Sequence, residues 1–133
     1  MTLPQRISYI TLGARDMMRL RAFYRAMGWS ERPGSDDDFA TYDAGSAVIA
    51  LFPMAQLGQE AAPGEHGPTA GWNGTTLGIN VGAREDVDRI FRASVSAGAR
   101  AVAEPVARQW GGYSGYIADP EGTRWEITWA PAG

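Results

Sequence analysis

The side chains in this sequence that could do covalent or acid–base chemistry are few, and the missing types limit the chemistry most. The chain has no cysteine, and all 12 of its basic residues are arginine. A thiolate nucleophile, a cysteine-ligated metal and a lysine Schiff base are therefore excluded. The single histidine, His66, excludes a metal site built from several imidazoles. It is also the one histidine that could activate a serine nucleophile.

His66 stands in a segment, about 54–73, whose composition shifts to glycine, proline, alanine and glutamine. Such a segment is long for a connection in a compact domain, which indicates a linker or a functional lid. We interpret His66 as a solvated loop histidine, with a catalytic role as the alternative. Trp72, a large side chain among small ones, is expected to pack down onto the domain.

A second group of candidates is aromatic. Trp110, Tyr113 and Tyr116 lie among Gly111, Gly112 and Gly115, and Gly122 follows after the next turn. Glycine lets a backbone or a ligand approach closely, so this segment is the best candidate for an aromatic wall around a ligand. The alternative interpretation of such residues is core packing or a dimer interface, which we prefer for Trp125 and Trp129.

The elements that would position these residues occur twice. Asp16 begins a helical pattern that ends at Gly28, and Asp86 begins another, equally long, that ends at Gly98. Aspartate is a good helix N-cap and glycine a good helix end. Strand-like segments precede both patterns, 7–13 and 75–81, and Pro33 and Pro105 follow the two glycines. The repeat predicts two copies of one structural unit, with helices near 16–27 and 85–97.

Further strands complete each copy. Segments 39–42 and 47–52 have strand patterns in the first half. In the second half 99–103 and 124–129 have them, and the segment 110–118 leads into the turn at 119–122 that precedes the last strand. The last strand alternates so that Trp125, Ile127 and Trp129 share one face. We therefore expect an α+β fold of two βαβββ modules in a single domain over 1–133: module one at about 5–53, the linker at about 54–73, and module two at about 74–131.

The second module closes with Trp110-Gly111-Gly112, Asp119-Pro120-Glu121-Gly122 and Trp125-Glu126-Ile127. With a βαβββ unit present twice, this pattern resembles the vicinal oxygen chelate superfamily, which includes glyoxalase I, bleomycin-resistance proteins and extradiol dioxygenases. The resemblance covers nearly the whole chain. It implies that each module curls into a half-barrel and that the pair forms a cup that holds a ligand. The fold alone does not determine the chemistry, which depends on the residues at each position of the site.

Metal-using members of the superfamily place ligands on the first and last strands of each module. Carried onto this sequence, the first-strand positions fall on Tyr9 and Thr76, and the last-strand positions fall on Ala50 (or Ile49) and Glu126. Divalent metals in such sites need several imidazole or carboxylate donors, and Glu126 alone is a normal ligand. We therefore expect no catalytic metal and no cofactor.

Two roles remain for Glu126. One is structural: its carboxylate completes a hydrogen-bond network inside the cup, with Arg124 or Tyr9 as partner. The other is functional: it acts as a general base or anchors a cationic group of a ligand. We expect the ligand to contact a set of six residues, in which Glu126 is also the candidate catalytic residue: Tyr9, Thr76, Trp110, Tyr113, Tyr116 and Glu126.

Two classes of function follow from these residues. In the first, the protein holds a small organic molecule in an aromatic, acidic cup without turnover, as drug-sequestering members of the superfamily do. In the second, it is an enzyme of the superfamily (a lyase, isomerase or dioxygenase), metal-free through Glu126 or metal-dependent. A purely structural or regulatory module is a third possibility that nothing in the sequence excludes.

Composition limits the partners and the location. The chain has 133 residues, a hydrophobic fraction of 44% and a net charge of −3. A negative charge argues against binding to nucleic acid or to an anionic membrane surface. There is no apolar run of membrane-spanning length and no N-terminal signal-peptide pattern, so we expect a cytoplasmic protein. Half-barrel sheets leave edges that pairing would cover, so we also expect a homodimer.

Overall fold

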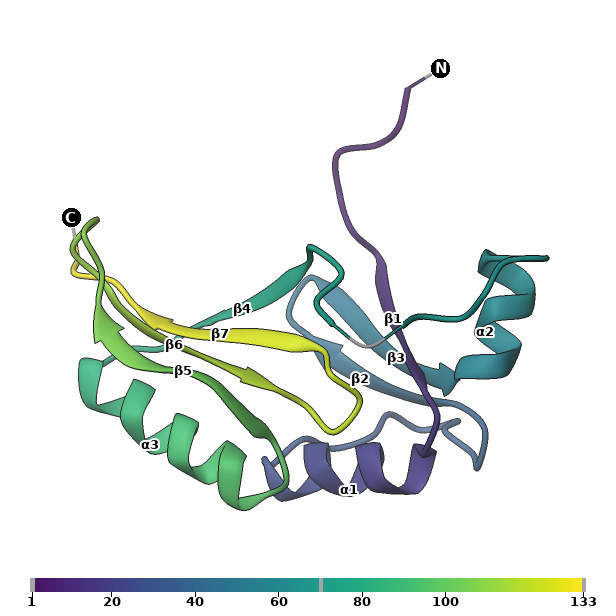
Figure 1. Ribbon diagram of the computed structural model, residues 1–133, viewed down its shortest axis with the longest axis horizontal. Coiled ribbons are helices and arrows are strands. Elements are labelled where there is room, and N and C mark those ends of the chain that lie inside the picture. Colours follow the sequence, from purple (N-terminus) through teal and green to yellow (C-terminus); the bar gives the residue numbers. More distant parts are fainter. Residues whose placement is uncertain (1, 70, 133) are drawn as a thin grey trace. The chain divides into compact units, whose positions relative to one another are not determined.

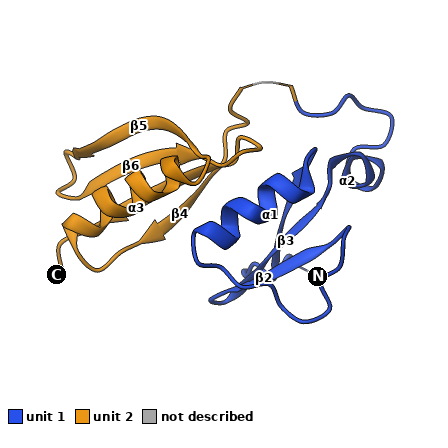
Figure 2. Ribbon diagram, turned by 90° about the horizontal axis from the view of Figure 1, so that it is seen from below, with its two compact units in different colours: residues 1–68 blue, residues 69–133 orange. Residues whose placement is uncertain are grey.

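Figure 1 shows the computed structural model of the chain, which describes residues 2–69 and 71–132. The chain forms two compact units, Met1–Pro68 and Thr69–Gly133 (Figure 2). The boundary falls inside the predicted linker. Each unit combines helices with its own sheet, so the predicted α+β architecture is confirmed. No helix in the described part of the chain is long and apolar enough to cross a membrane.

The first unit contains a three-stranded sheet and two helices. The strand order is β1-β3-β2, in which β1 is parallel and β2 antiparallel to β3. In chain order the elements are β1 (Tyr9–Ala14), α1 (Met17–Ala26), β2 (Ala40–Ala44), β3 (Ala47–Pro53) and α2 (Met54–Ala61).

Helix α1 begins and ends as the sequence predicts. The side chain of Asp16 accepts a hydrogen bond from the Arg19 backbone N–H at 3.0 Å, which satisfies one of the unpaired donors of the first turn. Leu20, Phe23 and Tyr24 are buried against the sheet. The chain then leaves the helix at Gly28, whose φ of 89° is readily adopted only by glycine.

The core of the first unit is partly aromatic. The Tyr24 ring stacks on Trp29 at 4.9 Å between centroids, and Trp29 meets Tyr42 of β2 edge-on at 5.4 Å. Tyr42 is buried, and burial raises the pKa of its phenol. These contacts hold α1 and the segment after it against β2.

The first sheet lacks a strand that the sequence analysis predicted. A βαβββ module has a strand directly after its helix, but residues 29–39 form an irregular segment in which Arg32 N–H donates once to Thr41 O, at 2.7 Å. Pro33 has no N–H to donate, and Gly34 has a φ of 94°. Asp36 then closes a turn through its side chain. The turn-forming residues prevent the repeated hydrogen bonding that a strand requires.

Helix α2 was also not predicted. It occupies the first part of the segment 54–73 that the sequence analysis assigned to a linker or lid, and it packs on β1 and β3. The close approach depends on Gly13 of β1, because a side chain there would overlap Met54 and Leu57. Trp72, beyond the helix, does not pack down as expected: it is 60% exposed, and its indole N–H donates to Thr75 O.

The second unit contains a four-stranded sheet of order β4-β7-β6-β5, with one helix on one side of it (Figure 1). Strand β4 is parallel to β7, and the other pairs are antiparallel. In chain order the elements are β4 (Thr76–Asn80), α3 (Arg84–Ser96), β5 (Arg100–Ala107), β6 (Tyr113–Ala118) and β7 (Arg124–Trp129).

Helix α3 begins slightly earlier than predicted. The sequence analysis placed its cap at Asp86, but the N-cap is Ala83, and Glu85 and Asp86 lie in the first turn. Carboxylates there stabilise the helix through its dipole rather than as a cap. Val87 and Phe91 are buried against the sheet, and the chain turns at Gly98, with φ of 120°.

The two units pair their strands in corresponding registers. In the first, Thr11 of β1 lies opposite Ala50 of β3; in the second, Gly78 of β4 lies opposite Glu126 of β7. Counting back along each first strand, Tyr9 and Thr76 occupy equivalent positions. The repeat therefore places Ala50 and Glu126 at equivalent sites, as the sequence analysis assumed.

Gly115 provides a test of packing in the second sheet. A methyl group on Gly115 would lie 2.9 Å from Cγ and 3.0 Å from N of Pro105, at the irregular part of β5. We expect Gly115→Ala to destabilise the protein by about 1–3 kcal/mol through overpacking. Urea denaturation monitored by circular dichroism measures this change.

The matched control is Gly78→Ala in β4 of the same sheet, where a methyl group would meet no atom within 4 Å. Its free energy of unfolding is expected to change by less than about 0.5 kcal/mol. Equal effects of the two substitutions would contradict the proposed contact between Gly115 and Pro105.

Candidate functional site

The candidate site lies on the side of the second sheet that faces away from α3. Tyr116 of β6 and Glu126 of β7 are register partners, so their side chains emerge next to each other from neighbouring strands. Both are partly exposed. We call this side of the sheet the Glu126 face; by register it carries Thr76, Gly78, Asn80, Ser114, Tyr116, Ala118, Arg124, Glu126 and Thr128.

The opposite side of the same sheet is set by its contacts with α3. Trp125 and Ile127 are buried there, on either side of Glu126 in sequence. Because successive residues of a strand point to opposite sides, their burial directs Glu126 and Thr128 to the other side. The alternation that the sequence analysis found in the last strand is thus confirmed for its buried residues.

Strand β4 leaves room beside Glu126. Its register partner there is Gly78, where a methyl group would meet no atom within 4 Å. Thr76 lies two residues earlier on the same strand, opposite Arg124, and is exposed. The carboxylate of Glu126 therefore has Tyr116 on one neighbouring strand and open space on the other.

The electrostatics of this pair keep the tyrosine protonated. Burial raises the pKa of Tyr116 most, and the negative charge of Glu126 and a hydrogen bond to its carboxylate raise that pKa further; Arg108 acts in the opposite direction. A neutral Tyr116 hydroxyl beside an acceptor carboxylate can donate a hydrogen bond and hold the carboxylate in place.

Arg108, which the sequence analysis missed, extends the site. Its Nε donates to Ser114 Oγ at 2.8 Å, and its Nη2 donates to Ser114 O at 3.0 Å. The guanidinium carbon lies 5.6 Å from the centroid of the Tyr116 ring. Alternation is the sequence signal that could have identified the neighbours of Arg108 in this site. It places Ser114 and Tyr116 on one side of β6, as it places Glu126 and Thr128 on one side of β7.

A buried hydroxyl completes the same region. Thr128 lies opposite Ser114, is 9% exposed, and its Oγ1 has no hydrogen-bond partner within residues 2–69 and 71–132. An unpaired buried hydroxyl is costly, and this one is shielded from solvent by its neighbours.

Two of the predicted aromatic residues lie elsewhere in the second unit. The Tyr113 hydroxyl donates to Asp88 Oδ1 of α3 at 2.7 Å, and Arg84 of α3 lies 4.2 Å from its ring centroid. Tyr113 thus lies on the α3 side and does not join Tyr116. Trp110 lies in the β5–β6 turn, 59% exposed, with its ring against Gly112. The close approaches at Gly112 and Gly115 are made by Trp110 and Pro105 of the chain itself.

The remaining predicted residue, Tyr9, begins β1 in the first unit. It pairs with Val48 and is 63% exposed. Ala50, at the position equivalent to Glu126, is buried between Thr11 and Thr41. A contact between Tyr9 and a ligand stays a prediction.

A divalent metal does not fit these positions. The equivalent strand positions hold a phenol, a hydroxyl, a methyl group and one carboxylate, at Tyr9, Thr76, Ala50 and Glu126. Such metals need several imidazole or carboxylate donors. Within the described ranges, no group of three or more His, Asp or Glu side chains could hold a metal ion.

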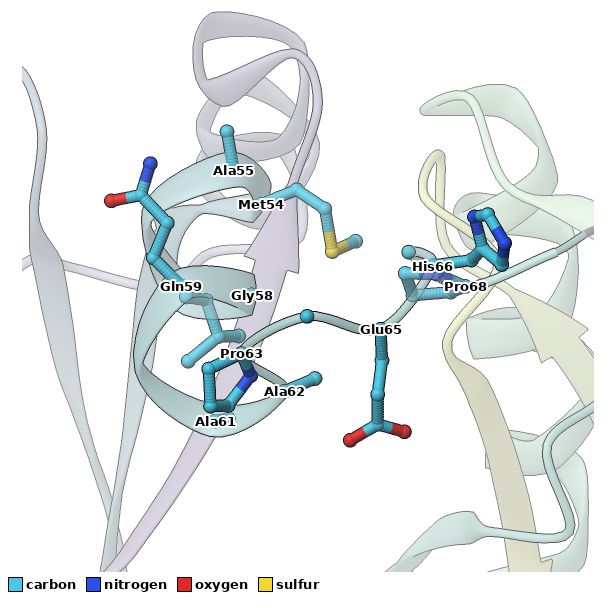
Figure 3. A pocket seen from close by; sticks show the side chains of 13 residues that line it. Met54, Ala55, Gly58, Gln59, Ala61, Ala62, Pro63, Glu65, His66 and Pro68 are labelled. Atoms are coloured by element: carbon cyan, nitrogen blue, oxygen red, sulfur yellow. The ribbon is translucent and has the colours of Figure 1, made fainter.

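His66 belongs to a different region. It lines a hollow of the first unit formed by α2 and the loop that follows it, together with Met54 and Pro68 (Figure 3). In Figure 3 the Met54 side chain extends from α2 toward the His66 and Pro68 side of the hollow, while Glu65 points away from them. His66 is exposed, in agreement with a solvated loop histidine.

Comparison with known proteins identifies relatives of the fold. The model of the family described as the glyoxalase/bleomycin resistance protein/dioxygenase superfamily matches residues 6–127. No curated protein sequence matches the chain.

Several solved structures share the fold. A glyoxalase-related enzyme from Fulvimarina pelagi is 28% identical, with a TM-score of 0.85 over 98% of this chain and 94% of that one. A glyoxalase/bleomycin resistance protein/dioxygenase family enzyme from Burkholderia phytofirmans is 24% identical, with a TM-score of 0.77 over 93% and 98%. A lactoylglutathione lyase from Agrobacterium tumefaciens is 21% identical, with a TM-score of 0.67 over 96% of each chain. The predicted glyoxalase-like fold class is confirmed.

The contact between Tyr116 and Glu126 predicts a shift in titration. Glu126→Gln removes a negative charge and a strong acceptor, so we expect the pKa of Tyr116 to fall while burial keeps it above its ordinary value. The measurement is the near-ultraviolet absorbance of tyrosinate against pH, with Tyr116→Phe identifying the signal.

The matched control is Asp88→Asn. It removes the carboxylate that accepts from Tyr113, and should lower the pKa of Tyr113 without changing that of Tyr116. An unchanged Tyr116 titration in Glu126→Gln would show that the two side chains do not interact.

Proposed function

Because the chain belongs to the glyoxalase/bleomycin resistance protein/dioxygenase superfamily, we propose that it binds a small organic molecule without a catalytic metal. The bound molecule carries a cationic or hydrogen-bond-donating group, which Glu126 holds on the Glu126 face of the second unit. Thr76 and Tyr116 lie on the same face, and the Tyr116 ring supplies an aromatic surface for the molecule.

One observation carries the proposal: Glu126 and Tyr116 face each other across β7 and β6, with open space over Gly78 on the other side. A carboxylate on a central strand loses part of its hydration, and that loss is costly unless a partner compensates for it. The neutral Tyr116 hydroxyl beside the carboxylate can occupy one acceptor position at most, which leaves acceptor capacity on Glu126 for a ligand.

The chemistry of the equivalent position in the first unit supports the assignment to the second. Ala50, buried, has no group that could bind a polar ligand, whereas Glu126 is partly exposed. Neither pair of equivalent positions, Tyr9 with Ala50 in the first unit or Thr76 with Glu126 in the second, has the donors that metal coordination needs, and the second pair suits hydrogen bonding and a single charge contact.

The test uses benzylamine as the cationic probe and anisole as a neutral probe of similar size. We expect Glu126→Gln to weaken benzylamine binding by about tenfold, about 1.4 kcal/mol, and to leave anisole binding unchanged. Calorimetric titration of the full chain, before and after treatment with a chelator, gives both affinities.

The matched control is Glu104→Gln, which removes an exposed carboxylate from β5 of the same sheet. Equal benzylamine affinity in the wild-type chain and in Glu126→Gln would make Glu126 a scaffold residue and refute the proposal. Loss of binding on chelation would refute its metal-free part. Consumption of the probe at a rate that depends on Glu126 would favour the enzyme alternative over binding alone.

We also propose that the protein forms a homodimer. Large apolar side chains are exposed in both units, among them Ile7, Tyr9 and Met18 in the first and Val102 and Val106 in the second. Pairing of two copies would remove such surface from water.

Sedimentation velocity at micromolar concentration measures the assembly. We expect a single species of twice the chain mass, because the apolar side chains favour association. A monomer over the whole micromolar range would contradict the dimer.

A further inference from the structure

We infer that the ligand is a small zwitterion, whose cationic group lies at Glu126 and whose anionic group lies at Arg108 and Thr128. The inference rests on the proposed function, since it adds a second charged contact to the same site. It assigns Arg108 and Thr128 as specificity-determining residues.

Arg108 is held as a fixed cation. Two of its nitrogens, Nε and Nη2, donate to Ser114, while Nη1 donates to no group within the described ranges. None of the carboxylates described lies within ion-pair distance of Arg108. A guanidinium fixed by two hydrogen bonds loses little further freedom when it binds a carboxylate or phosphate oxygen through its remaining donor.

Thr128 supplies a second donor beside this cation. Its register partner is Ser114, the residue that fixes Arg108, so Thr128 and Arg108 flank one residue of β6. The Thr128 Oγ1 is buried and has no partner in the described part of the chain. Because Oγ1 is shielded from solvent, an anionic oxygen held by Arg108 would accept from Thr128 as well once a neighbouring side chain moves aside.

Glu126 lies two residues before Thr128 on β7, and the two side chains are on the same side of the sheet. Residues two apart on a strand are separated by about 7 Å, so the carboxylate and the Arg108–Thr128 pair form two charged ends of one short site. The Tyr116 ring is next to both ends, since it is the register partner of Glu126 and has the Arg108 guanidinium at 5.6 Å.

The separation of these charges selects against singly charged ligands. Arg108 and Glu126 do not pair with each other, so each is left to interact with a bound molecule. A simple cation at Glu126 is repelled by Arg108, and a simple anion at Arg108 is repelled by Glu126. A molecule that carries both charges, a few bonds apart, is attracted at both ends.

A second arginine, Arg124, lies on the Glu126 face and is less suited to this role. Arg124 is two residues from Glu126 in the opposite direction, and its Nη1 donates to Gly122 O at 2.8 Å in the β6–β7 turn. Within the described part of the chain, the Arg124 guanidinium makes no cation–π contact with the Tyr116 ring. Arg124 therefore provides a matched control for the loss of one positive charge near Glu126.

The experiment uses three probes of one shape: 4-(aminomethyl)benzoate, benzylamine and 4-methylbenzoate. Calorimetric titration of the full chain should give an affinity for the zwitterion about tenfold or more above that of either singly charged probe. Arg108→Gln should remove most of this advantage, measured as the ratio of the two affinities within the same variant. Thr128→Val, which keeps the shape of the side chain, should weaken binding of the zwitterion more than binding of benzylamine.

Arg124→Gln should reduce zwitterion binding much less than Arg108→Gln does. Because Arg108→Gln also removes two hydrogen bonds to Ser114, an unchanged near-ultraviolet circular dichroism spectrum of that variant serves as the measure of an intact site. Equal effects of the two arginine substitutions would overturn the inference, as would a zwitterion that binds no better than benzylamine.

The outcomes separate this inference from the proposed function. Benzylamine binding that depends on Glu126, with no advantage for the zwitterion, would retain the proposed function and refute the inference. Failure of all three probes to bind at millimolar concentration would refute both. A zwitterion advantage lost in Arg108→Gln, and retained in Arg124→Gln, would support the inference.

Discussion

The side-chain alternation along β7 is the constraint on which the second unit depends. This strand lies inside the sheet, between β4 and β6, so both of its edges are hydrogen-bonded and its register is fixed twice. Burial of Trp125 and Ile127 against α3 commits the intervening Glu126 to the opposite side. A slip of one residue would bury a carboxylate and expose an indole, which no compensating interaction would offset. The stability of the core and the position of Glu126 therefore have one cause.

The two units use the same strand pairing for different purposes. In the first, the position equivalent to Glu126 is Ala50, and Phe39 and Phe52 make an edge-to-face contact on the same side of the sheet. In the second, the corresponding side carries Ser114, Tyr116, Glu126 and Thr128, close to Arg108. A repeated backbone thus supports one largely apolar sheet face and one polar face. In our proposal, the charges of Arg108 and Glu126, which do not neutralise each other within the second unit, select the ligand.

Local irregularities determine where each sheet ends. Strand β5 accommodates Pro105 because it is an edge strand, its pairing with β6 is irregular, and Gly115 opposite has no side chain. The corresponding segment of the first unit has Pro33, a positive φ at Gly34 and a turn closed by Asp36, and it forms no strand. The turn in the second unit is formed more regularly: the Asp119 side chain accepts hydrogen bonds from the N–H groups of Glu121 and Thr123. It brings β7 back beside β6 in the register that pairs Tyr116 with Glu126.

The sequence by itself determined the repeat, helices α1 and α3, the strands of the second unit and the polar side of β7. These features depend on caps, glycines and side-chain periodicity, which act over a few residues and are visible in one chain. The sequence pattern did not predict α2, because that helix depends on the close approach at Gly13 of the neighbouring strand. The repeat also predicted a strand after α1, although Pro33, Gly34 and Asp36 form turns there and prevent it. Glu126 and Tyr116 were both found from the sequence, but their pairing came from the register of β6 and β7. Tertiary structure also decided that the Tyr113 hydroxyl donates to Asp88 and that the Arg108 guanidinium donates to Ser114. Contacts between strands fix which side chains meet, and no local pattern encodes them.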